Sequence, residues 1–360
     1  MNCSIVTFHR AHNYGAVLQA YALQKTIGRM GHNVSFFDYQ HEEIAKVYRL
    51  LPIPGNEGGI IYLKRLVHTV LDFKRKKARY NAFNGFINSN FKLSDSKKEQ
   101  VFDVVVLGSD QIWNPEYTCG FVDTHFGRHQ NLKTRKVVSY AASLGQSKLE
   151  SGQLTEFNQK ISTIDIVGVR EDSLKDMILS SFKESDVSVN LDPTLLLDKS
   201  DWDSISSKRE ISDPYVLVYE VKYNNLTKGA VEYIEKLYGL KVVVLSARTN
   251  YKISKDYITG ASPQQFLSLF KHADFVITTS FHGTVFSIIN NKPFITLAFG
   301  DHTDVRSYSL LKKVGLDKRI VDKADSFVTA EETINYDLAN EKLDSLRFES
   351  INYLSKCLEE

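Results

Sequence analysis

The sequence has few cysteines, and it lacks the residue patterns of metal-binding, disulfide-bonded and membrane-spanning proteins. Its three cysteines, Cys3, Cys119 and Cys357, lie far apart, which excludes a disulfide framework and favours a reducing cytoplasm. No spacing of Cys, His, Asp or Glu indicates a metal site. No apolar run reaches the roughly 18 residues of a spanning helix. The start, MNCSIVTFHR, lacks the basic region of a signal peptide, so we expect a first buried strand there.

A large net charge is also absent. The 360 residues carry a net charge of +2, which argues against nucleic-acid binding. Residues 64–79, KRLVHTVLDFKRKKAR, are an exception, because they hold seven Lys or Arg against one Asp, with apolar residues at helical spacing. We expect a basic amphipathic helix here. It either packs as an ordinary surface helix or contacts an anionic membrane or acceptor.

Short apolar runs alternate with helical patterns along most of the chain, which predicts an α/β protein with parallel sheets. Residues 192–214 are polar and bounded by two Asp-Pro steps, and they indicate a domain boundary. We expect two Rossmann-like domains facing each other across a cleft, with ligands at the carboxyl ends of the strands. The expected units are residues 1–195 with a helical insertion near 60–90, residues 212–335, and a terminal helix over 336–360.

Polar residues follow two predicted strands in the N-terminal half. The first strand precedes HRAHNYGAVLQ, which has no GxGxxG pattern and therefore no dinucleotide fingerprint. Asn13 and Gly15 there belong either to an ordinary turn or to a site. A later strand precedes GSDQIWNP, which contains Ser109, Asp110, Gln111 and Trp113. A turn needs fewer polar groups than this, so we expect a binding site.

Two arginines follow other strands. Arg170 opens a predicted helix, where a cation is unfavourable unless an anion lies opposite. The alternative is a surface ion pair with Glu171 or Asp172. Arg306 follows a strand near residue 297, and the alternative there is an ordinary charged helix start.

The segment DFVITTSFHGTVF places a histidine and a glycine between a buried strand and a helix. Ser280 can cap this helix, and Gly283 can expose its first amides. An exposed helix N-terminus binds phosphate. His282 beside it can transfer a proton near neutral pH, so the segment predicts a phosphate-binding turn with an acid–base group.

Five segments in order resemble the polysaccharide pyruvyl transferase family. They are NYGAVLQAYAL (13–23), VVLGSDQIWNP (105–115), VGVRED (167–172), SPQQFLSLFKHADFVITTSFHGTVFSIINNKPF (262–294) and DVRSYSLLKKVGL (304–316). The resemblance covers nearly the whole chain. It implies a fold like the GT-B glycosyltransferases and transfer of pyruvate from phosphoenolpyruvate to a sugar as a ketal, during synthesis of a capsule or exopolysaccharide. Phosphoenolpyruvate is then a co-substrate, and no cofactor is required.

Some family members carry Arg two positions before the His of the His-Gly pair, whereas this chain has Ser280. We therefore expect Arg170 and Arg306 to hold the donor's carboxylate or phosphate. His282 is expected to act as general acid and Asp110 as base for the acceptor hydroxyl. The other expected donor-binding residues are Ser280, Phe281, Gly283 and Thr284, and those of the acceptor side are Asn13, Gly15, Ser109, Gln111 and Trp113.

The expected partners are phosphoenolpyruvate and a lipid-linked saccharide, with peripheral contact to the inner membrane through residues 64–79. Two alternatives stay open. A glycosyltransferase could use a nucleotide sugar in the same cleft, or a non-catalytic member of an assembly complex could bind a sugar or an anion. A donor screen distinguishes the first, and the effect of His282→Asn distinguishes the second.

Overall fold

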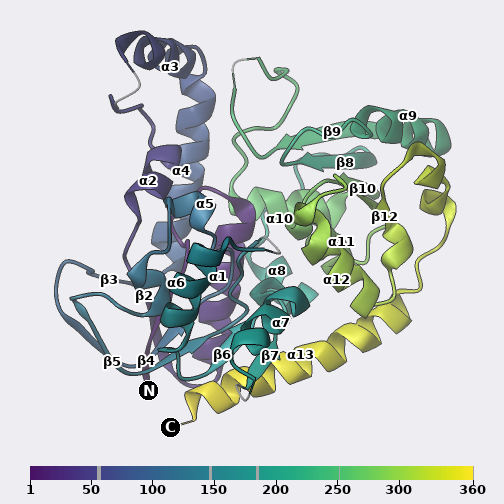
Figure 1. Cartoon of the computed structure of the whole chain (residues 1–360). Coiled ribbons are helices and arrows are strands. Elements are labelled where there is room, and N and C mark those ends of the chain that lie inside the picture. The colour runs from purple at the N-terminus through teal and green to yellow at the C-terminus, as the bar shows by residue number, and fades with distance from the viewer. Residues whose placement is uncertain (55–57, 146–147, 184–185, 251, 360) are drawn as a thin grey trace.

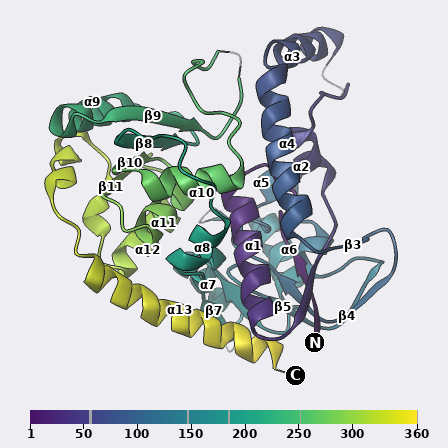
Figure 2. The ribbon, with the colours of Figure 1, turned by 180° about the vertical axis from the view of Figure 1, so that it is seen from behind.

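The computed structural model describes residues 1–54, 58–145, 148–183, 186–250 and 252–359. Within these residues the chain forms two parallel five-stranded sheets, with a cleft between the domains built on them (Figures 1 and 2). This confirms the expected α/β class with two Rossmann-like domains in a GT-B-like arrangement. The exact limits of the two domains stay predictions.

The first sheet has the strand order β3-β2-β1-β4-β5, and each neighbouring pair is parallel. Its strands are β1 (Asn2–Val6), β2 (Asn33–Phe37), β3 (Leu93–Ser94), β4 (Gln100–Leu107) and β5 (Leu132–Ser139). The run of apolar residues that ends β4 is fully buried, because helices cover both faces of the sheet. A short pair, β6 (Val167–Val169) and β7 (Val187–Val189), extends the sheet beyond β5 through a bridge between Val138 and Ile166.

Eight α-helices are described in the chain up to residue 205. They are α1 (Tyr14–Arg29), α2 (Glu42–Tyr48), α3 (Gly59–Leu71), α4 (Phe73–Asn90), α5 (Pro115–Thr118), α6 (Ser151–Ile161), α7 (Asp172–Ser181) and α8 (Lys199–Ile205). The expectation of a continuous basic helix over residues 64–79 was wrong. Asp72 leaves the helical conformation, with φ −109° and ψ 10°, and it is buried between the two helices. The basic residues are therefore divided between α3 and α4.

The second sheet has the order β12-β11-β10-β8-β9 and is also parallel. Its strands are β8 (Tyr215–Glu220), β9 (Lys241–Ser246), β10 (Phe275–Thr278), β11 (Phe294–Leu297) and β12 (Ile320–Val321). The helices around it are α9 (Thr227–Tyr238), α10 (Pro263–His272), α11 (Phe281–Ile289) and α12 (Val305–Lys313). All four residues of β10 and all four of β11 are buried, so this sheet is also covered on both faces.

The last helix, α13 (Tyr336–Leu358), runs from the second domain back to the first (Figure 1). The Tyr353 hydroxyl donates to the Ser139 carbonyl at 2.8 Å, at the end of β5. The Leu191 amide donates to the Ser350 hydroxyl at 3.0 Å. These contacts fasten the C-terminal helix to the first domain.

The two domains also pack directly on one another through α1 and α10. The rings of Tyr14 and Phe266 stack with their centroids 4.5 Å apart, and the Tyr14 hydroxyl donates to the Ala261 carbonyl at 2.8 Å. Arg79 on α4 is buried and donates to carbonyls of both domains, at His12 (2.9 Å) and Thr259 (3.3 Å). One hydrophobic core therefore crosses the domain boundary. None of the described helices is long and apolar enough to span a bilayer.

Candidate functional site

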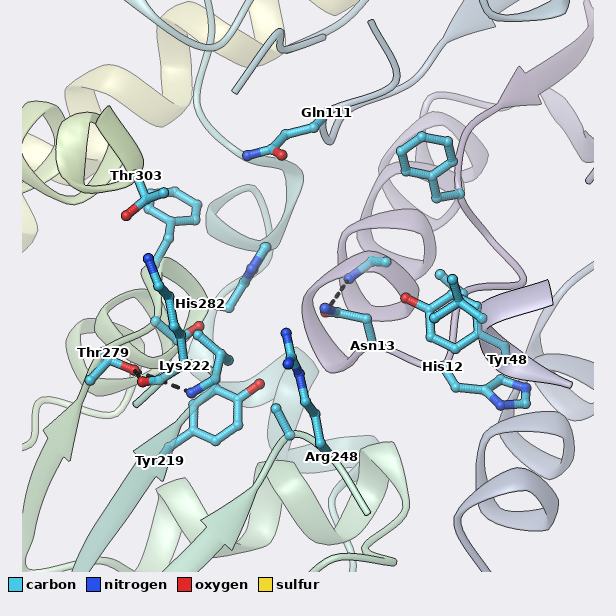
Figure 3. A pocket seen from close by; sticks show the side chains of 18 of the residues that line it. His12, Asn13, Tyr48, Gln111, Tyr219, Lys222, Arg248, Thr279, His282 and Thr303 are labelled. Carbon is cyan, nitrogen blue, oxygen red and sulfur yellow. Dashed lines mark hydrogen bonds between the residues drawn. The ribbon is translucent and has the colours of Figure 1, made fainter. Parts of the chain in front are cut away.

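The cleft lies between the carboxyl ends of the two sheets and has a volume of about 920 Å³. Ligand pockets commonly measure roughly 300–1,000 Å³, so this one has room for more than one small molecule. In Figure 3, Lys222, Thr279 and His282 lie on the side of the second domain. Asn13 and Tyr48 face them from the first domain.

His282 lies in the first turn of α11, directly after β10. The Thr284 amide donates to the Ser280 carbonyl at 2.9 Å, which begins the helix. The Ser280 side chain does not cap it, contrary to expectation, and the Ser280 amide instead donates to the Thr278 hydroxyl at 3.1 Å. The N-terminus of α11 therefore reaches the cleft without a side-chain cap.

Gly15 touches the ring of His282 from the opposite domain. A Cβ atom at residue 15 would lie 2.1 Å from His282 Nδ1, a distance at which something must shift. Only glycine permits this approach. Asn13 is the N-cap of α1, and its side-chain oxygen accepts from the Ala16 amide at 3.3 Å. The N-termini of α1 and α11 therefore converge on one end of the cleft, where their partial positive charges favour an anion.

Asp192, which follows β7, lies behind His282 and has a fully buried side chain. Its Oδ2 is 2.9 Å from Arg170 Nη2 and 3.5 Å from His282 Nε2, and its Oδ1 accepts from the Thr194 amide at 2.9 Å. The 3.5 Å separation is an ion-pair distance and not a hydrogen bond. Burial by itself would raise the pKa of Asp192, but the Arg170 guanidinium and His282 hold this pKa well below its usual range.

Arg170 does not line the cleft. Its side chain is 3% exposed, and it pairs with Asp192 and donates to the Ser109 hydroxyl. The surface ion pairs considered from the sequence are not formed by this residue. Glu171 instead accepts from the Ser143 hydroxyl at 2.6 Å, and Asp172 accepts from Lys313 at 2.9 Å. The structure therefore places Arg170 behind the cleft wall, where it can reach a ligand only through its neighbours.

Arg306 does line the cleft, near the start of α12. Its guanidinium lies 5.4 Å from the ring centre of Phe281, and the Arg170 guanidinium lies 5.7 Å from the same ring. A cation at a helix N-terminus is unfavourable without a facing anion. Lys222, which follows β8, adds a second cation to the same wall, and it was not among the residues predicted from the sequence.

The other expected donor-binding residues divide into two groups. Ser280 and Phe281 line the cleft with His282, whereas Gly283 and Thr284 lie beneath it. A Cβ atom at residue 283 would lie 2.0 Å from the Thr278 hydroxyl, so this glycine is required for helix–strand packing. The Thr284 hydroxyl is 2.7 Å from that of Thr296 and is buried.

Asp110 and Gln111 line the cleft from the loop after β4. Asp110 has a φ of 75°, a left-handed conformation that costs a residue with a side chain about 1–3 kcal/mol. The Ser143 amide donates to the Asp110 carbonyl at 3.0 Å and helps to hold this conformation. Ser109 and Trp113 are buried instead, and the indole of Trp113 donates to the His125 carbonyl at 2.9 Å. These two residues support the loop from below.

Several further cleft residues were not identified from the sequence. They are His12, Tyr48, Lys76, Arg79, Tyr80, Tyr117, Tyr219, Lys222, Arg248, Thr279 and Thr303. Burial, assisted by Arg79, lowers the pKa of His12 to about 4. Burial, assisted by the Asp110 carboxylate, raises the pKa of Tyr48 to about 12. His12 and Thr279 lie in strand-end segments that the sequence pattern did single out, and Lys76 and Arg79 lie within residues 64–79. Most of the others come from elements without a distinctive motif.

No group of His, Cys, Asp and Glu in the described part of the chain is arranged to hold a metal ion. One end of the cleft instead gathers Arg306, Lys222 and two helix N-termini, which favour an anion. Asp304 also lines this end, and the Asp301 carboxylate lies 3.5 Å from Lys222 Nζ.

The fold and the cleft define a two-domain, GT-B-like protein whose cleft holds a histidine beside two helix N-termini. The family model of polysaccharide pyruvyl transferase matches residues 13–301, so the chain belongs to that family. A comparison with curated proteins gave no match.

Solved structures resemble the chain over most of its length at low identity. UDP-GlcNAc 2-epimerase from Methanocaldococcus jannaschii has 12% identity and a TM-score of 0.49, with 93% of each chain covered. The enzyme of that name from Neisseria meningitidis, bound to UDP-GlcNAc, has 10% identity and a TM-score of 0.48, covering 98% of this chain and 99% of that one. MurG from Acinetobacter baumannii has 11% identity and a TM-score of 0.41, with 98% of each chain covered.

Proposed function

We propose that the protein transfers pyruvate from phosphoenolpyruvate to two hydroxyls of a sugar, forming a ketal. The observation that carries this proposal is the position of His282. It stands at a helix N-terminus in the cleft, touches Gly15 of the other domain and is backed by the buried carboxylate of Asp192. A proton-transfer group therefore lies beside the part of the cleft that favours an anion.

The donor would bind with its phosphate and carboxylate toward Arg306, Lys222 and the first amides of α11. Arg306 can hold a carboxylate or phosphate through two parallel hydrogen bonds. Some family members carry an arginine at the position of Ser280, which is uncharged. Lys222 supplies a second positive charge in the cleft instead. Arg170 then acts as a positioning residue, because it holds Asp192 and flanks Phe281 from behind.

The chemistry requires one proton donor and one base. His282 in its protonated form gives a proton to the methylene carbon of the donor, which becomes the methyl group, and the central carbon becomes electrophilic. One sugar oxygen bonds to that carbon, and Asp110 accepts its proton. The second hydroxyl forms the other bond as the carbon–phosphate oxygen bond breaks. Inorganic phosphate leaves with the proton that Asp110 accepted, and the second hydroxyl's proton returns to His282, so both groups regain their starting protonation.

The acceptor would occupy the side of the cleft formed by the first domain. Tyr48, Tyr80 and Tyr117 line that side, and tyrosines combine an apolar ring for a sugar face with a hydroxyl for its polar edge. A lipid-linked precursor of a capsule or exopolysaccharide is the acceptor that we propose. The protein would then work in the cytoplasm, at the inner face of the membrane.

The test is incubation with phosphoenolpyruvate and a panel of lipid-linked saccharides. Phosphate release together with the mass of an added pyruvate on one saccharide is expected. Turnover of a nucleotide sugar without consumption of phosphoenolpyruvate would instead establish a glycosyltransferase. Saccharide binding without turnover of either donor, unchanged in His282→Asn, would establish a non-catalytic binding protein.

A further inference from the structure

The helix α3 has its apolar side turned toward solvent. The exposed residues of that side are Ile60 (75% exposed), Leu63 (58%), Val67 (48%), Val70 (65%) and Leu71 (61%). At 100° per residue these five positions fall on one face of the helix. A surface helix normally buries such a face in its own domain, so this arrangement indicates that something else covers it.

The opposite side of α3 belongs to the cleft. Thr69 is 8% exposed and lines the cleft together with His68 of the same helix. Asp72 and Lys76 continue this wall into α4. Because its polar side faces the cleft, α3 cannot turn its apolar side inward without breaking the cleft wall. The exposed apolar face and the mouth of the cleft are therefore two sides of one helix.

The charges around the apolar face have one sign. Residues 58–71 contain no Asp or Glu. Lys64 on α3 is exposed, as are Lys74 and Lys77 near the start of α4. A second copy of the chain would bring the same lysines against these, which is unfavourable. An anionic surface is attracted instead, by about 1 kcal/mol for each basic residue close to it.

We propose that α3 docks on an anionic lipid bilayer, with its apolar face among the lipid head groups and its cleft side toward the acceptor. The helix is about 20 Å long and lies at the outer end of the first domain (Figure 1). Helices with an apolar face flanked by lysines bind bilayers in this orientation. The lipid of the acceptor stays in the bilayer, while its sugar enters the cleft past His68. Docking refines the proposed function by defining how that acceptor arrives, but its physical basis is independent of catalysis.

The test is flotation of the full-length protein with vesicles of phosphatidylcholine mixed with phosphatidylglycerol, and with vesicles of phosphatidylcholine alone. The wild-type protein should float with the anionic vesicles at low salt and far less with the neutral ones. The double variant Leu63→Glu/Val67→Glu should reduce vesicle binding by roughly tenfold or more, because two apolar contacts are replaced by repelled charges. Both side chains are exposed, so folding should be unaffected, and circular dichroism checks this.

The matched control is Leu338→Glu/Phe348→Glu on α13. Both residues are exposed apolar side chains of a helix, 49% and 66% exposed, and the variant makes the same change of charge. It should float like the wild type. Equal loss of flotation in both variants, or no flotation of the wild type, would overturn docking through α3. So would a loss of dimers in the α3 variant by analytical ultracentrifugation, since that would assign the face to a second copy.

Activity measurements distinguish failure of the docking proposal from failure of the proposed function. On a short water-soluble acceptor, Leu63→Glu/Val67→Glu should turn over like the wild type, because neither residue lines the cleft. On an acceptor embedded in anionic vesicles its rate should fall with its binding. Vesicle binding without any pyruvyl transfer would leave docking established and the proposed function refuted.

Discussion

The ring of His282 occupies the space that any side chain at residue 15 would need. A Cβ atom on Gly15 would lie 2.1 Å from His282 Nδ1 and 2.4 Å from Cε1. Gly15 belongs to the first turn of α1 and His282 to the first turn of α11, so the contact joins the two domains. The position of the proposed acid therefore depends on a helix of the domain that would bind the acceptor.

Replacing Gly15 by Ala should displace the His282 ring and lower the rate of pyruvyl transfer by roughly a hundredfold or more. Alanine normally stabilises the interior of a helix by about 0.5–1 kcal/mol relative to glycine, but the clash should cancel that gain. Gly28→Ala in the same helix is the control, because no atom lies within 4 Å of the added Cβ. It should be stabilised and fully active. Equal activity in both variants would disprove the role of the contact.

His282→Ala should remove most of the turnover while leaving the fold intact. General acid–base groups contribute roughly 100- to 10,000-fold to the rate. The rate of phosphate release from phosphoenolpyruvate in the presence of acceptor measures this, and thermal denaturation checks the fold. Activity within a few-fold of the wild type would end the proposed role of this histidine.

Asp192→Asn should destabilise the fold, because it leaves the buried Arg170 without its anionic partner. Removing one member of a buried pair costs about 3–5 kcal/mol. The pKa of Asp192 is depressed in the folded protein, so its contribution is complete above the unfolded pKa of about 3.9 and is lost as the pH falls below it. The free energy of unfolding, measured by urea denaturation, should therefore differ most from the wild type near pH 7 and less below about pH 4. The double variant Asp192→Asn/Arg170→Met should recover part of the loss, and no recovery would contradict the ion-pair explanation.

Arg306→Lys should weaken use of the donor even though the charge is kept. Lysine cannot form the two parallel hydrogen bonds of a guanidinium, and a lost charge-assisted hydrogen bond costs about 1.5–3 kcal/mol. The Michaelis constant for phosphoenolpyruvate should rise, or kcat/KM fall, by roughly ten- to a hundredfold. Arg128→Lys, at an exposed position away from the cleft, serves as the control. Unchanged donor kinetics in Arg306→Lys would place the anion site elsewhere.

His12→Gln should flatten the dependence of stability on pH between about 4 and 6.5. The pKa of His12 is about 4 in the folded protein, whereas its ordinary value is 6.5. As the pH falls, His12 therefore binds a proton in the unfolded chain before it does so in the folded protein. The free energy of unfolding of the wild type should decrease by roughly 2–3 kcal/mol across this interval. Urea denaturation at several pH values measures the difference. A residual slope from His125, whose burial lowers its pKa to about 3, should remain in the variant, and an unchanged total slope would contradict the assignment.

The sequence predicted the two parallel sheets and several of the loops that form the cleft. Asp110, Gln111 and His282 all follow strands in the sequence, and all three line the cleft. The prediction of these residues succeeded because the carboxyl ends of parallel strands lie at one edge of a sheet. A residue that directly follows a strand in the sequence therefore lies at that edge. It failed for Tyr48, which lies in α2 without a motif and reaches the cleft through tertiary packing. Lys222 was missed although it follows β8 and the same rule applies to it.

The amino-acid sequence by itself determined the alternation of strands and helices, the glycine and histidine at the turn before α11, and the basic character of residues 64–79. These features depend on which residues are neighbours along the chain. That order is the same however the domains pack, so it can be interpreted without the tertiary structure. Only the tertiary structure decided that Gly15 fits against His282, that Arg170 pairs with Asp192 inside the protein, and that α3 turns its apolar side outward. Each of these depends on how the helices and domains pack together, and packing that joins distant segments leaves no local pattern in the sequence.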